Sequence, residues 1–285
     1  MSEPARFRVP LGPFLALFYA FFSLVLAGMF LALVSGFGPG GARDIPSAGL
    51  AIFAASVLVA TLIDRVHGGR DSLALRLPKA AAIPLALVGG FALAPLSDAV
   101  ADLVVKRFPH AGDGDPLDLG ATLGSKGLAA AAFLILLPFA EELLFRGALL
   151  GALRDRPALT LGGGDDDDGP ARPTADSAPP VPGAAFIALG IFALTRGEPR
   201  TIPSALLLGA STTFLRLRTD ALLTAVLFHV GYMLRDVVGI FAPALAAFPT
   251  ARLVVLVPCA LAWLACLALI AKVGASPASA PAVAD

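Results

Sequence analysis

Residues 121–150 read ATLGSKGLAAAAFLILLPFAEELLFRGALL, a long apolar run that carries two adjacent glutamates and an arginine near its end. A helix needs about 20 apolar residues to cross a bilayer, and this run is long enough. Ionised side chains inside a bilayer cost at least about 2.5 kcal/mol each unless they are paired, so they usually have a function. The stretch therefore predicts a transmembrane helix that carries polar chemistry.

The rest of the chain is similarly apolar. Hydrophobic residues make up 57% of the 285 and charged residues 15%, whereas soluble domains have about 25% charged residues. Backbone groups in lipid must be satisfied within their own segment, and no barrel strands are evident, so we expect helices. The sequence predicts an all-α, polytopic transmembrane helical bundle of about eight spans: 13–34, 47–63, 80–104, 121–150, 181–195, 202–217, 221–235 and 252–272.

The chain divides into three predicted regions. We expect N-terminal transmembrane helices over 1–120, a core over 121–240, and a last transmembrane helix with a flexible tail over 241–285. Residues 162–183, GGGDDDDGPARPTADSAPPVPG, are rich in Gly, Pro and Asp and are predicted to form a disordered loop. The first three helices and the last are predicted to serve as scaffold.

The orientation follows from the basic residues of the loops. Arg6 and Arg8 precede the first span, which is longer than the roughly 7–15 apolar residues of a signal peptide. Lys and Arg are more frequent in the loops on the side of the N-terminus, which is typical of the cytoplasmic side. We expect an integral protein of the cell (inner) membrane with both termini cytoplasmic.

The charged residues of the fourth span differ in their neighbours. Glu142 and Arg146 are four apart, with Glu first, which favours an ion pair along the helix. Glu141 points about 100° away around the helix and lacks a partner there. A buried, unpaired carboxylate holds a proton more readily, which suits a general base near neutral pH. The alternative is that both glutamates only hold helices together.

A histidine lies in the seventh span, within TAVLFHVGYM (224–233). At about 1.5 Å per residue, His229 lies roughly 14 Å from the cytoplasmic end near Asp220. Glu141 lies roughly 20 Å from the corresponding end near Arg154. These depths favour one shared polar pocket, although a lone intramembrane histidine is often only a packing residue.

Composition also argues against several classes of function. The formal net charge is +0, which gives no indication of nucleic-acid binding. The chain has three histidines and two cysteines, which is a poor set of ligands for a metal. We therefore expect neither a metal nor a cofactor.

The motif EELLFRG (141–147) fits EExxxR, the first motif of the CPBP (CAAX protease and bacteriocin-processing) family. Residues 185–199, the sixth span and LRLRTDALLTAVLFH (215–229) also resemble that family's core, so that the resemblance covers about 126–235. It implies a helical intramembrane endopeptidase of the glutamate type. Glu141 then matches the catalytic glutamate, Arg146 the motif arginine and His229 the later histidine.

Two positions depart from the family pattern. The second motif, FxxxH, reads Phe192-Ala-Leu-Thr-Arg196, and the third, HxxxN, reads His229-Val-Gly-Tyr-Met233. Arginine accepts no proton and ligates no metal, and methionine donates no hydrogen bond to an oxyanion. If Arg196 points into the pocket it pairs with Glu141 and weakens it as a base; alternatively, it stabilises an oxyanion.

The leading interpretation is a membrane-embedded CPBP/CAAX-type endopeptidase that acts on membrane-anchored or lipidated proteins or peptides. The alternative is a catalytically impaired CPBP paralog that binds such segments or assists a partner membrane protease or sorting system. A transporter that uses Glu141, Arg146 and His229 as a proton relay is a third interpretation. In each case the lipid bilayer is a partner. The predicted supporting residues of the site are Glu142, Arg146, Arg196, Phe192 and Met233.

Overall fold

The computed structural model describes residues 11–37, 45–67, 73–107, 127, 130–154, 181–196, 198–199, 201–241 and 253–274. Within these ranges the chain forms eight helical rods and no strand. The expected all-α fold is therefore confirmed.

Seven rods are single helices, and the eighth is built from four consecutive segments. The single helices are α1 (Pro13–Phe37), α2 (Ile45–His67), α3 (Ala82–Arg107), α7 (Val181–Leu194), α8 (Ile202–Thr219), α9 (Leu222–Phe241) and α11 (Leu253–Gly274). The composite rod, called the core rod below, consists of the π-helix η2 (Ala132–Leu136), α5 (Leu137–Glu142), the π-helix η3 (Leu143–Leu149) and α6 (Leu150–Arg154).

Each predicted span overlaps one rod. Residues 121–126 of the predicted fourth span, 162–180 of the predicted loop and the tail after Gly274 lie outside the described residues. The predicted loop was wrong at its end, because α7 already begins at Val181. Pro182 is responsible, since proline suits the first turn of a helix, where its missing N–H has no helical partner.

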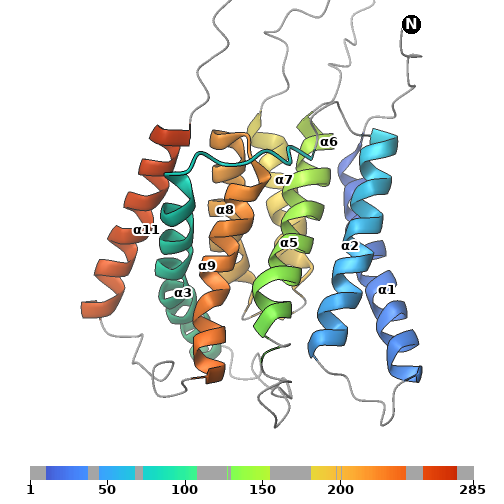
Figure 1. Ribbon diagram of the computed structural model, residues 1–285, viewed down its shortest axis with the longest axis horizontal. Coiled ribbons are helices and arrows are strands. Elements are labelled where there is room, and N and C mark those ends of the chain that lie inside the picture. Colours follow the sequence, from blue (N-terminus) through green and yellow to red (C-terminus); the bar gives the residue numbers. More distant parts are fainter. Residues whose placement is uncertain are drawn as a thin grey trace, which may run out of the picture.

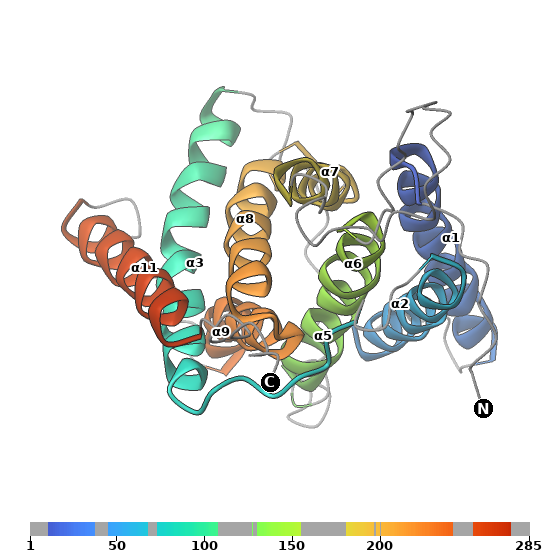
Figure 2. The ribbon, with the colours of Figure 1, turned by 90° about the horizontal axis from the view of Figure 1, so that it is seen from above.

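The rods lie side by side with their axes in roughly the same direction (Figure 1). Seen from above, α1 and α2 lie at one end of the bundle and α3 and α11 at the other, with the remaining helices between them (Figure 2). Helices α1, α2, α3 and α11 contain segments long and apolar enough to cross a membrane. Large apolar side chains such as Phe14 and Leu253 are exposed on them, as lipid-facing positions require.

Two glycines bring α3 and α9 into very close contact. A Cβ atom on Gly90 would lie 1.9 Å from the carbonyl oxygen of Phe228, and one on Gly231 would lie 2.2 Å from that of Leu87. Small residues at helix crossings let membrane helices pack closely. Since His229 precedes Gly231 by two residues, about 200° around the helix, this contact turns His229 away from α3 and toward the core rod.

Candidate active site

The two adjacent glutamates lie at the end of α5, near the middle of the core rod. Glu142 is fully buried, and Glu141 retains 12% exposure. The π-helix η3 begins directly after them, and such segments often occur at functional sites. The two carboxylates have different partners, so they differ in what they can do chemically.

Glu142 binds both Arg146 and His229. Its Oε2 lies 3.4 Å from Nε of Arg146, which is the pair expected from the four-residue spacing. Its Oε1 lies 3.0 Å from Nδ1 of His229 on α9. All three side chains are buried. Glu142 therefore holds the imidazole in place, a role that the sequence analysis missed because no local spacing links residues on separate helices.

Arg146 is accommodated by two neighbours. Its guanidinium carbon lies 4.0 Å from the ring centroid of Phe192 on α7. Gly209 on α8 leaves room for it, since a Cβ atom there would lie 2.8 Å from Nη2 of Arg146. In the described part of the chain Nη1 and Nη2 have no hydrogen-bond partner. The charge of Arg146 therefore depends on Glu142 and on the face of the Phe192 ring.

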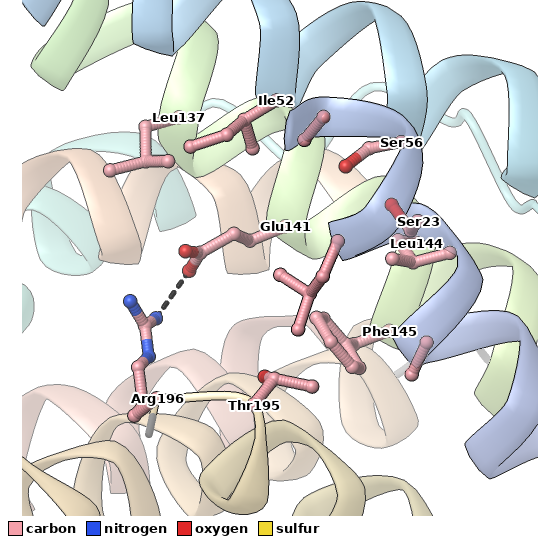
Figure 3. Close-up of a pocket in the computed structure, with 12 residues that line it drawn as sticks. Ser23, Ile52, Ser56, Leu137, Glu141, Leu144, Phe145, Thr195 and Arg196 are labelled. Carbon is pink, nitrogen blue, oxygen red and sulfur yellow. Dashed lines mark hydrogen bonds and ion pairs between the residues drawn. The ribbon is translucent and has the colours of Figure 1, made fainter. Parts of the chain in front are cut away.

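Glu141 is bound by Arg196. Nη2 of Arg196 donates directly to Oε2 of Glu141 (Figure 3). The same Oε2 lies 3.8 Å from Nε2 of His229, which has no hydrogen-bond partner among the described residues. The structure thus brings Glu141, His229 and Arg196 together, but the carboxylate oxygen that is close to the imidazole is held by a guanidinium.

Arg196 lies directly after the short helix α7. The helix has 14 residues and is about 21 Å long, less than the roughly 30 Å of a bilayer's hydrocarbon core. Arg196 follows in a turn, where its backbone N–H donates to the carbonyl of Ala193. Its guanidinium carbon lies 4.6 Å from the Phe192 ring, which therefore contacts both arginines.

A cavity of about 260 Å³ adjoins the Glu141–Arg196 pair. Its lining residues are Ala20, Ser23, Leu24, Ala27, Ile52, Ser56, Leu137, Glu141, Leu144, Phe145, Thr195 and Arg196 (Figure 3). His229 is fully buried and does not line it. Helices α1 and α2, which were expected to serve as scaffold, also form part of the cavity wall.

Met233, the remaining predicted site position, adds no hydrogen-bond donor to the site. Met233 lies one helical turn beyond His229 and is buried, and its thioether donates no hydrogen bond. Across the residues that the structure covers, no group of three or more His, Cys, Asp or Glu side chains is placed to hold a metal ion.

Residues 124–234 match a family model described as type II CAAX prenyl endopeptidase Rce1-like. This segment is similar to the Rce1-like family. The match spans the core rod, α7, α8 and most of α9, and it contains Glu141, Arg196 and His229. The expected resemblance to the CPBP family is thereby confirmed. No curated protein and no solved structure gives a significant match to the chain.

The apolar helices identify an integral membrane protein, and its residues 124–234 are similar to CAAX-type intramembrane proteases. The Rce1-like core supplies the glutamates, Arg146, Arg196 and His229. Helices α1 and α2, which lie outside the match, supply half of the cavity's lining residues. The cavity is therefore lined by both the Rce1-like segment and the N-terminal helices.

Proposed function

We propose that the protein is a catalytically impaired Rce1-like paralog. It binds a membrane-embedded segment of an anchored or lipidated protein or peptide and holds it for a partner membrane protease or sorting system. One observation carries this proposal: the Glu141 oxygen nearest His229 is held by Arg196. We also propose that the protein resides in the cell membrane with both termini cytoplasmic, as the basic loop residues indicate.

The ion pair opposes hydrolysis for a chemical reason. A general base must accept a proton from a water molecule within hydrogen-bond distance. Arg196 occupies the oxygen that faces the imidazole, and a guanidinium is permanently charged and accepts no proton. Loss of general-base catalysis costs about 10²–10⁴ in rate, and loss of an oxyanion donor, where Met233 stands, costs about 10²–10³.

A second candidate function is endopeptidase activity, and the cavity favours it. The cavity reaches both Glu141 and Arg196, so a peptide carbonyl in it would lie beside a fixed guanidinium. A preorganised positive charge of this kind stabilises an oxyanion. Only Oε2 of Glu141 takes part in the pair with Arg196, which leaves Oε1 outside it. On this second proposal, Oε1 activates the water and Arg196 acts as the electrophile.

Cleavage and binding assays separate the two candidates. The full chain is reconstituted in liposomes with two fluorogenic peptides, a prenylated CAAX peptide and an acyl-anchored peptide without a prenyl group. We expect wild type to bind at least one peptide and to cleave neither faster than Glu141→Ala does. The double variant Arg196→His/Met233→Asn should cleave at least about tenfold faster, since it restores a base and an oxyanion donor.

Each contrary outcome identifies which statement is wrong. If wild type cleaves well above Glu141→Ala, the protein is an endopeptidase and the impaired proposal is refuted. If the double variant gains no activity, Arg196 and Met233 are not what limits catalysis. If adding Glu141→Ala to the double variant leaves its gained cleavage intact, Glu141 is not the base. If neither peptide binds wild type, the holding function is refuted.

A further inference from the structure

The cavity beside Glu141 contains two hydroxyl groups that the chemistry above does not use. Ser23 comes from the middle of α1 and Ser56 from the middle of α2, and their exposed fractions are 4% and 2%. Figure 3 shows both on one side of the cavity, while the Glu141 carboxylate turns toward Arg196. Both helices lie outside the residues that match the Rce1-like family.

These hydroxyls differ from others on the same helices and on α8. Thr61, Ser211 and Thr219 each donate to the backbone carbonyl four residues earlier, at 2.7–2.8 Å. Such back-bonding is how a hydroxyl on an apolar helix is ordinarily satisfied. Ser23 and Ser56 make no hydrogen bond within the described ranges. Each therefore retains a donor and acceptor sites for an occupant of the cavity.

The wall that α1 contributes is made mostly of small side chains. Ala20, Ser23, Leu24 and Ala27 follow a spacing of three and four residues, so they share one face of the helix. Leu24 is 43% exposed, which places the edge of the cavity at the bundle surface beside α1. An occupant can therefore enter from the bilayer at the level of Glu141.

The size and polarity of the cavity select among occupants. Its 260 Å³ corresponds to about nine water molecules at roughly 30 Å³ each. An intact helix, about 10–12 Å across with its side chains, is too wide for it. A hydrocarbon chain offers no hydrogen-bonding groups to the two serines. An unwound peptide carries free backbone N–H and C=O groups, which at membrane depth need partners inside protein.

We propose that this cavity binds an unwound, extended stretch of a membrane-anchored peptide, with Ser23 and Ser56 hydrogen-bonded to its backbone. The inference rests on the proposed function and names the part of the ligand that is held. It assigns to α1 and α2 the selection of segments that unwind easily. Arg196 and Glu141 form the opposite, charged end of the same site.

Peptide binding in vesicles tests the proposal. The probes are two single-span peptides, one with Pro-Gly at mid-membrane, where proline breaks helical hydrogen bonding, and one with Ala-Ala there. Energy transfer between labelled peptide and labelled protein gives Kd for wild type and for the double variant Ser23→Ala/Ser56→Ala. The control is Ser204→Ala, because the wild-type Ser204 hydroxyl already donates to the carbonyl of Ser97. We expect tighter binding of the Pro-Gly peptide, weakened on the order of tenfold by the double variant alone.

The outcomes distinguish this inference from the proposed function. If both peptides bind wild type equally, or the double variant binds like wild type, the cavity does not hold unwound backbone. If a free isoprenoid alcohol displaces the peptide from wild type and double variant alike, the occupant is hydrocarbon and the inference is overturned. If no peptide binds wild type, both proposals fail. Thermal unfolding of each variant shows whether lost binding reflects lost folding.

Discussion

The buried pair of Glu142 and Arg146 gives the sharpest stability prediction. Arg146 has 1% of its side chain exposed, and among the described residues Glu142 is the carboxylate that forms an ion pair with it. Replacing Glu142 by Gln keeps an oxygen for His229 but leaves the guanidinium uncompensated. Breaking one partner of a buried ion pair costs about 3–5 kcal/mol, so we expect Glu142→Gln to lower the free energy of unfolding by that amount.

A second substitution shows whether the cost comes from the stranded charge. In Glu142→Gln/Arg146→Met the buried charge is absent and most of the side-chain volume is retained. Replacing a buried ion pair in this way usually changes the free energy of unfolding little. The two substitutions should therefore be non-additive, with a coupling energy of at least about 2 kcal/mol.

The assay is equilibrium unfolding of the purified chain in mixed micelles, followed by the fluorescence of Trp263. This indole donates to Ser211 between α11 and α8 and so reports on helix packing. A cost below about 1 kcal/mol for Glu142→Gln would show that Arg146 is solvated or paired elsewhere. Additive costs in the double variant would refute the argument from the stranded charge.

Three further predictions concern packing and reactivity. Gly231→Ala should destabilise the bundle by about 1–3 kcal/mol, because its Cβ would meet the backbone of Leu87. The control Gly28→Ala, where the added Cβ has open space, should stabilise the protein by up to about 1 kcal/mol in the same unfolding assay. Phe192→Leu removes the ring under both guanidiniums and should cost about 1–2 kcal/mol in unfolding free energy; an unchanged value would mean that ring and cations do not interact. Arg196→Met should increase labelling of Glu141 by an apolar carbodiimide, measured by mass spectrometry, because the carboxylate loses its guanidinium partner; Arg235→Met, which frees Asp98 instead, should leave Glu141 labelling unchanged.

Hydropathy and short-range spacing were sufficient to predict the fold and one contact of the site. The predicted first span, 13–34, differs from α1 (Pro13–Phe37) only at its end, because the length of an apolar run determines where a membrane helix lies. The Glu142–Arg146 pair also followed from spacing, since residues four apart are neighbours on a helix. Both are local properties of the chain.

The contacts between helices were not predictable in this way. The bond between Glu142 and His229 joins residues 87 apart in sequence. It depends on how α9 is rotated, and the close approach of α3 and α9 at Gly90 and Gly231 fixes that rotation. The position of α1 and α2 beside Glu141 likewise depends on packing between helices. The spacing of apolar residues along one helix does not predict which other helix it contacts. Neither Ser23 nor Ser56 was singled out from the sequence, because isolated serines are common on apolar helices.

The brevity of α7 has an evolutionary consequence. Because Arg196 lies in the turn directly after α7, the number of residues from Val181 to Arg196 sets where along the bundle the guanidinium lies. Adding or deleting a few residues between them would withdraw or re-aim that charge without altering any residue of the core rod or α9. Relatives with the same two glutamates and the same histidine can thus differ in whether their carboxylate is occupied, through helix length alone.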